Sequence, residues 1–82
     1  MALTDTAVEQ AQPVEKPQKL FDGGGLYLFV TPEGGKYWRL KYRFGGKERK
    51  LALGVYPRVT LEAARGLRDQ ARASLAEGVD PG

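Results

Sequence analysis

The sequence predicts a small α+β domain in which a three-stranded antiparallel sheet packs on one C-terminal helix. Short apolar and aromatic runs, bounded by glycines, fill residues 26–53, and this pattern is typical of strands. From residue 60 the apolar residues recur at steps of three and four, which is typical of a helix. A chain of 82 residues is close to the smallest size that one hydrophobic core supports, so we expect a single domain.

A short helical turn is expected at the N-terminus, because Thr4 is well suited to cap the first free N–H groups of a helix. Pro13 and Pro17 then favour an extended lead-in. We therefore divide the chain into a helical turn with its lead-in over residues 1–18, a sheet-plus-helix domain over residues 19–79, and the start of a linker over residues 80–82.

Three segments are expected to form the sheet. Leu26–Val30 is rich in aromatic and branched residues, and it is followed by Tyr37–Phe44 and Lys47–Leu53. Gly45-Gly46 separates the last two segments and suits a two-residue hairpin turn, which needs positive φ angles. Leu20-Phe21 is a candidate for a short extra edge strand.

The C-terminal helix is expected to begin after Thr60, which is a good N-cap residue, and to end at Gly78. Pro81 prevents its continuation. Gly66 within the helix costs about 1 kcal/mol relative to alanine, and we expect that it allows a close approach to the sheet. The apolar face consists of Leu61, Ala64, Leu67, Ala71 and Leu75.

The Gly45-Gly46 turn fixes the register of the hairpin and gives it one face that is apolar near its base. This face is the expected seat of the C-terminal helix. Its expected cross-strand pairs are Phe44 with Lys47, Tyr42 with Arg49, Leu40 with Leu51, and Trp38 with Leu53.

The opposite face of the hairpin combines cations with aromatic residues. Its expected cross-strand pairs are Arg43 with Glu48, Lys41 with Lys50, and Arg39 with Ala52. Like charges directly opposite each other, as in the pair of lysines, destabilise a sheet, so a face selected only for solubility would more easily have used Glu. If their strand pairs alongside, Tyr27 and Phe29 join this face, and Leu26, Leu28 and Val30 join the core. The candidate DNA-binding residues of this face are Tyr27, Phe29, Tyr37, Arg39, Lys41, Arg43 and Lys50. Lys47 and Arg49, which flank the hairpin tip, are expected to contact phosphates as well.

The positive charge of the chain is concentrated on this hairpin. The net charge is +3, but residues 36–58 alone carry eight Lys or Arg against the single acidic residue Glu48. Such a local field favours a polyanion as the partner. A basic two- or three-stranded ribbon also fits the major groove of DNA. The alternative is an ordinary solvated sheet face.

The composition excludes several classes of chemistry. With no cysteine and no histidine, the chain lacks the means for a disulfide, a thiolate metal site or a histidine general base. We expect no cofactor, no metal, no small-molecule substrate and no catalysis, since none of the four tyrosines has supporting catalytic groups. No apolar run is long enough to span a membrane and no signal peptide is evident, so we expect a cytoplasmic protein.

Two smaller patterns are interpreted structurally. The segment DGGGL at residues 22–26 lacks the ending of a phosphate-binding loop, and we expect a tight bend in which Asp22 bonds nearby backbone N–H groups. Arg65, Arg68 and Arg72 form a stripe on the helix, interspersed with acidic residues, and we expect a salt-bridged solvent face.

The sequence resembles the N-terminal domain of phage and genomic-island integrases of the tyrosine recombinase family. The resemblance rests on DGGGLYL, YWRLKYR, LALGVYP and the closing GVDP, and it covers essentially the whole chain. It implies an arm-type DNA-binding domain whose three-stranded sheet lies in the major groove, in bacterial cytoplasm and at the nucleoid when bound. The Arg, Lys, His and Tyr residues of recombinase chemistry belong to a separate C-terminal domain of that family.

The sequence therefore predicts binding of double-stranded DNA at arm-type sites, which would position the recombinase for integration or excision of a mobile element. The other partners expected are the rest of the integrase chain and other integrase subunits. Two alternatives remain open: a protein-interaction module for another integrase subunit or an acidic partner, and a sheet that stacks single-stranded DNA or RNA on Tyr27, Phe29 and Tyr37.

Overall fold

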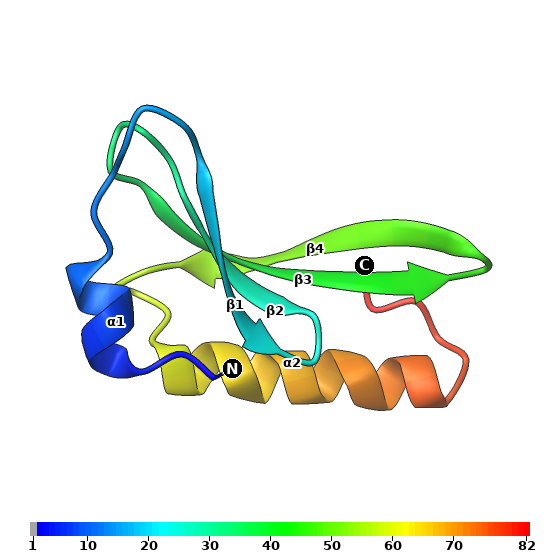
Figure 1. The fold of residues 1–82 in the computed structure, drawn as a ribbon. Helices are drawn as coiled ribbons and strands as arrows, with labels where there is room; N and C mark the ends of the chain where they lie inside the picture. Colours follow the sequence, from blue (N-terminus) through cyan, green and yellow to red (C-terminus); the bar gives the residue numbers. More distant parts are fainter. Residues whose placement is uncertain (1) are drawn as a thin grey trace.

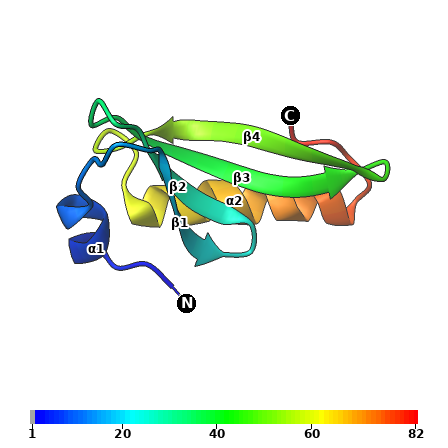
Figure 2. The ribbon, with the colours of Figure 1, turned by 45° about the horizontal axis from the view of Figure 1, so that its top comes forward.

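The computed structural model describes residues 2–82 and has α+β architecture, with one sheet lying over a long C-terminal helix (Figure 1). The strands lie side by side in sequence order and every neighbouring pair is antiparallel (Figure 2). The elements are α1 (Asp5–Gln10), β1 (Gln18–Gly23), β2 (Leu26–Val30), β3 (Lys36–Phe44), β4 (Lys47–Val55) and α2 (Leu61–Ala76).

The sheet has four strands, so the prediction of three was wrong in number. The proposed extra edge strand at Leu20-Phe21 exists as part of β1, which pairs with β2 from Gln18 opposite Val30 onwards. The strand signal of β1 in the sequence is weak, because the strand begins with the polar residues Gln18 and Lys19 directly after Pro17. Its Leu20 packs against the core and Phe21 lies on the opposite face.

The hydrophobic core lies between the sheet and α2. The prediction that Leu26, Leu28 and Val30 enter the core is confirmed, since all three are fully buried. α1 contributes Val8, which is also fully buried, so the N-terminal helix closes one end of this core. The fully buried Trp38 joins the same cluster, and its indole N–H donates to the carbonyl oxygen of Val59 at 2.7 Å.

The predicted register of the β3–β4 hairpin is confirmed from the turn as far as Arg39, which lies opposite Ala52. Beyond that point it was wrong: Trp38 lies opposite Gly54, because a bulge between Trp38 and Arg39 shifts the pairing by one residue. Gly54 has φ +148°, and a Cβ there would lie 2.3 Å from a methyl group of Val59. The bulge thus lets the connection to α2 pack tightly beneath Trp38.

The predicted N-caps of both helices and the predicted end of α2 are confirmed. Thr4 and Thr60 accept hydrogen bonds from the N–H groups three residues later, at 3.1 and 3.2 Å. After α2, Gly78 has φ +80° and its N–H bonds to the carbonyl of Leu75, while the N–H of Val79 bonds to that of Ser74. This is the Schellman arrangement, in which a left-handed glycine satisfies the last carbonyls of a helix.

Gly66 does not provide a close approach, so that prediction was wrong. It is exposed on α2, and a Cβ built there would meet no atom within 4 Å. Nothing in the described structure requires glycine at this position.

Candidate nucleic-acid interface

The candidate interface is the face of the sheet directed away from α2, which we call the outer face. Side chains on one face recur at every second residue of each strand and lie beside their partners across the strands. The register therefore assigns these residues to the outer face: Lys19, Phe21, Tyr27, Phe29, Tyr37, Arg39, Lys41, Arg43, Glu48, Lys50 and Ala52.

The outer face is strongly basic, because five of its residues are Lys or Arg and only Glu48 is acidic. The predicted placements of Lys41 opposite Lys50 and of Arg43 opposite Glu48 are confirmed. Lys41 and Glu48 form an ion pair at 3.0 Å with half-exposed side chains. A hydrogen bond from Lys41 lowers the pKa of Glu48, so Glu48 offsets part of the repulsion between the two lysines.

The aromatic residues of the outer face lie beneath cations. The guanidinium carbon of Arg39 is 4.5 Å from the ring centre of Phe29, and the Nζ of Lys19 is 5.7 Å from that of Tyr27. Both distances fall in the range of cation–π attraction. The ring of Phe21 lies 5.5 Å from that of Tyr27 in a tilted arrangement. The aromatics and cations of this face thus form one contiguous surface.

Tyr27 is the most buried member of this surface, with 1% of its area exposed. It belongs to neither hydrophobic cluster beneath the sheet and is enclosed by its neighbours on the outer face. Its hydroxyl is buried, and among residues 2–82 it has no hydrogen-bond partner. An unsatisfied buried polar group typically costs about 1–3 kcal/mol.

Two outer-face residues, Lys19 and Phe21, were missed by the sequence analysis. Both lie on β1, and the register places Lys19 opposite Phe29 and Phe21 opposite Tyr27. Phe21 is 56% exposed, which is unusual for a large apolar side chain. The apolar pair Leu20-Phe21 after Lys19 indicates a strand. Only the pairing of this strand with β2 shows that Lys19 and Phe21 lie on the outer face.

Lys47 and Arg49 do not lie on the outer face. They pair with Phe44 and Tyr42 on the face directed toward α2. The Nε of Arg49 is 3.8 Å from Oδ2 of Asp80, and the Tyr42 hydroxyl donates a hydrogen bond to Oδ1 of the same carboxylate at 2.6 Å. This bond raises the pKa of Tyr42 and lowers that of Asp80. Arg49 thus contributes to holding the C-terminal segment against the hairpin.

Asp22 anchors the β1–β2 turn to α2. It was expected to accept hydrogen bonds from nearby backbone N–H groups, but most of its donors are arginines of α2, and its one backbone donor among residues 2–82 is Leu3. Arg65 donates two hydrogen bonds to its carboxylate, at 2.9 and 2.8 Å, and Arg68 donates a third at 3.1 Å. The N–H of Leu3 donates a fourth at 2.8 Å. The Asp22 side chain is 2% exposed, and the hydrogen bonds from Arg65 are the main reason that its pKa is lowered.

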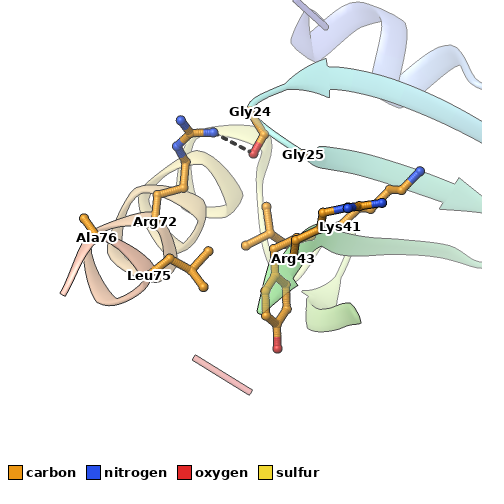
Figure 3. Close-up of a pocket in the computed structure, with 9 residues that line it drawn as sticks. Gly24, Gly25, Lys41, Arg43, Arg72, Leu75 and Ala76 are labelled. Carbon is orange, nitrogen blue, oxygen red and sulfur yellow. Dashed lines mark hydrogen bonds between the residues drawn. The ribbon is translucent and has the colours of Figure 1, made fainter. Parts of the chain in front are cut away.

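The arginine stripe on α2 is therefore largely structural, in contrast to the predicted solvent face. Arg72 continues it by donating to the carbonyl oxygen of Gly24 at 3.2 Å (Figure 3). A shallow hollow of about 590 Å³ lies between this turn, β3 and the end of α2. Figure 3 shows the side chains of Lys41 and Arg43 pointing away from α2, so these cations belong to the outer face.

Within residues 2–82 no cluster of three potential metal-ligating His, Cys, Asp or Glu residues occurs. In the same part of the chain no helix is both long and apolar enough to cross a membrane.

Comparison with known proteins identifies the family. A family model described as "Arm DNA-binding domain" matches residues 3–82. The chain is 52% identical to the integrase of Enterobacteria phage P4 over 83 residues, which is 99% of this chain and 19% of that protein. It is 47% identical over 79 residues both to the integrase of Shigella phage Sf6 and to the prophage integrase IntS of Escherichia coli (strain K12), in each case over 96% of this chain and 20% of the relative.

The chain belongs to the arm DNA-binding domain family. It spans about a fifth of the length of these relatives and corresponds to the N-terminal part of the integrases. The resemblance to integrases inferred from the sequence is thereby confirmed. The outer face of this arm DNA-binding domain presents five cations, and a field of this sign attracts a polyanion.

Proposed function

We propose that this arm DNA-binding domain binds double-stranded DNA with its outer face, at arm-type sites near the ends of an integrating element. The observation that carries the proposal is the register, which gathers Arg39, Lys41, Arg43 and Lys50 on one face of a two-stranded ribbon. The ribbon inserts into the major groove, which is about 12 Å wide and admits two strands. The cations contact phosphates and base edges there.

The hairpin formed by β3 and β4 provides the reading surface. Each of its strands has nine residues, so the ribbon is about 30 Å long at about 3.3 Å per residue. The inner face of the sheet packs against α2 through the hydrophobic core, and this packing supports the strands that carry the outer face. Of the remaining predicted contacts, Phe29 and Tyr37 pack beside the cations, and Lys47 contacts a phosphate near the hairpin tip.

In a longer integrase, the domain tethers and orients a site-specific tyrosine recombinase during integration or excision. This role is consistent with the position of the matched segment in the N-terminal part of its relatives. The rest of the integrase chain and other integrase subunits are the accompanying partners, and the bacterial cytoplasm is the compartment. Catalysis belongs to the remainder of such a protein.

In the free domain, the burial of Tyr27 removes one of the three aromatic rings on which single-stranded DNA or RNA would stack, while Phe29 and Tyr37 are half-buried. A stacking platform needs an exposed aromatic ring, whereas Tyr27 is enclosed by Phe21 and Lys19. The alternative function is binding of an acidic protein partner by the same outer-face cations.

The proposal is tested by titrating labelled duplex DNA, single-stranded DNA and RNA of the same sequence with the chain and with Arg39→Ala and Lys41→Ala. We expect duplex to bind most tightly and both substitutions to weaken it. Arg58→Ala is the matched control, because it removes the same charge from an exposed position between β4 and α2. Absence of duplex binding at low salt, or equal effects of all three substitutions, contradicts the proposal.

The salt dependence provides a second measure. If about four to six phosphates are neutralised, the plot of log K against log salt has a slope of about −4 to −5. Arg39→Ala should make the slope less steep by about one if Arg39 contacts a phosphate. A slope near zero for the unsubstituted chain would show that the outer face does not bind phosphates.

A further inference from the structure

The Tyr27 hydroxyl lies in an unusual environment for an outer-face group. It is buried and lacks a hydrogen-bond partner among the described residues, although it lies on a face dominated by cations. A phenylalanine would fill the same space without this defect, and Phe29 shows that this face accommodates phenylalanine two residues further along the same strand. The hydroxyl therefore does not serve the packing of the free domain.

The groups that enclose Tyr27 are held by weak forces. Across the strands its neighbours are Phe21 on β1 and Arg39 on β3. Lys19 lies over the Tyr27 ring, and Arg39 lies over the ring of Phe29. Attraction between a cation and a ring at an exposed site is modest, whereas a charge-assisted bond to a phosphate is strong and directional. A phosphate close to either cation would therefore compete with the ring beneath it.

We propose that DNA binding uncovers the Tyr27 hydroxyl, which then hydrogen-bonds to the duplex. The inference rests on the proposed function and adds a specific contact to it. In the free domain Lys19 and Arg39 cover the aromatic strip formed by Tyr27 and Phe29. When phosphates draw these two cations away, the hydroxyl gains a partner on a base edge or on the DNA backbone. The hydroxyl thus weakens the free domain and strengthens the complex.

Tyr27→Phe should therefore change the stability of the free domain and its affinity for DNA in opposite directions, which substitution of a purely structural residue would not do. Removing the unsatisfied hydroxyl should raise the melting temperature by about 4 °C or more. The same change should weaken duplex binding about three- to tenfold, as expected for one lost hydrogen bond. Tyr56→Phe is the matched control, since Tyr56 lies at the other edge of the sheet, under Lys36 and outside the outer face. It should leave duplex affinity unchanged.

The probe is a 30-base-pair duplex selected from a random library by the unsubstituted chain, compared with the unselected library. If Tyr27→Phe weakens binding to the selected duplex but not to the unselected library, the hydroxyl contacts a base edge. If Tyr27→Phe weakens binding to the selected duplex and to the library equally, the hydroxyl contacts the DNA backbone. A raised melting temperature with unchanged affinity for both duplexes overturns the inference. An unchanged or lowered melting temperature overturns its premise.

Arg39→Ala, measured in parallel, separates this inference from the proposed function. If Arg39→Ala weakens duplex binding and Tyr27→Phe does not, only the inference about the hydroxyl fails. If neither substitution affects binding, the outer face is not the DNA-binding surface and the proposed function fails with it.

Discussion

Replacing Asp22 with asparagine should destabilise the domain more than any conservative change on its surface. The carboxylate is 2% exposed and accepts hydrogen bonds from Leu3, Arg65 and Arg68. It therefore joins three parts of the chain: the N-terminal segment, the β1–β2 turn and α2. Asparagine keeps the shape but removes the charge and directs an amide donor toward the arginines.

The expected loss follows from the geometry. Removing one partner of a buried ion pair costs about 3–5 kcal/mol, because the other charge is left uncompensated. Here the Arg65 and Arg68 side chains are 36% and 19% exposed, so water can solvate them in part. We therefore expect a loss of about 2–3 kcal/mol, at or just below the lower end of that range. For a domain of this size, this lowers the melting temperature by about 10–20 °C.

Urea unfolding followed by the fluorescence of Trp38 measures this loss, because the single tryptophan of the chain is fully buried in the core. Asp69→Asn is the matched control: Asp69 also pairs with Arg68, but its side chain is 67% exposed. The control should cost less than about 0.5 kcal/mol. Equal losses for the two variants would refute the reasoning that burial, and not ion pairing as such, makes Asp22 important.

The pH dependence provides a second test of the same carboxylate. The pKa of Asp22 is lowered in the folded state, chiefly by its hydrogen bonds to Arg65. Its contribution is therefore fully present above the unfolded pKa of about 3.9, and it is lost as the pH falls through the lower folded pKa. Between pH 7 and acid pH, Asp22→Asn should lose less stability than the unsubstituted chain. Parallel curves for the two proteins would contradict the assignment.

Three further substitutions have defined expectations. Gly66→Ala should stabilise the domain by about 1 kcal/mol in urea unfolding, because the position is helical and its Cβ would meet nothing within 4 Å; a loss of stability would show a requirement that the structure does not reveal. Gly25→Ala should destabilise it by more than about 2 kcal/mol, since Gly25 has φ +90° and the new Cβ would lie 2.2 Å from the carbonyl oxygen of Lys41. Glu48→Gln should tighten duplex DNA binding in a titration at low salt, because it removes the acidic partner of Lys41 from the outer face; unchanged affinity would indicate that Lys41 does not contact DNA.

Local features of the sequence determined most of the elements. The two threonine caps, the Gly45-Gly46 turn and the glycine after α2 act through the backbone of a few neighbouring residues, so they could be recognised without a structure. The hairpin register followed from the turn, because each cross-strand pair is set by counting away from it. The basic outer face of β3 and β4 was a consequence of that register.

The tertiary structure decided the features that depend on contacts between distant residues. Pairing with β2 made an edge strand of Gln18–Gly23 and brought Lys19 and Phe21 to the outer face. The bulge beside Trp38 depends on Val59, which packs against Gly54 from the loop that leads to α2. Asp22 meets Arg65 across 43 positions of sequence, and no local pattern records such a pair. Tyr27 was correctly assigned to a face by alternation, but only the neighbouring strands enclose its hydroxyl, because burial on an open sheet depends on the side chains of every adjacent strand.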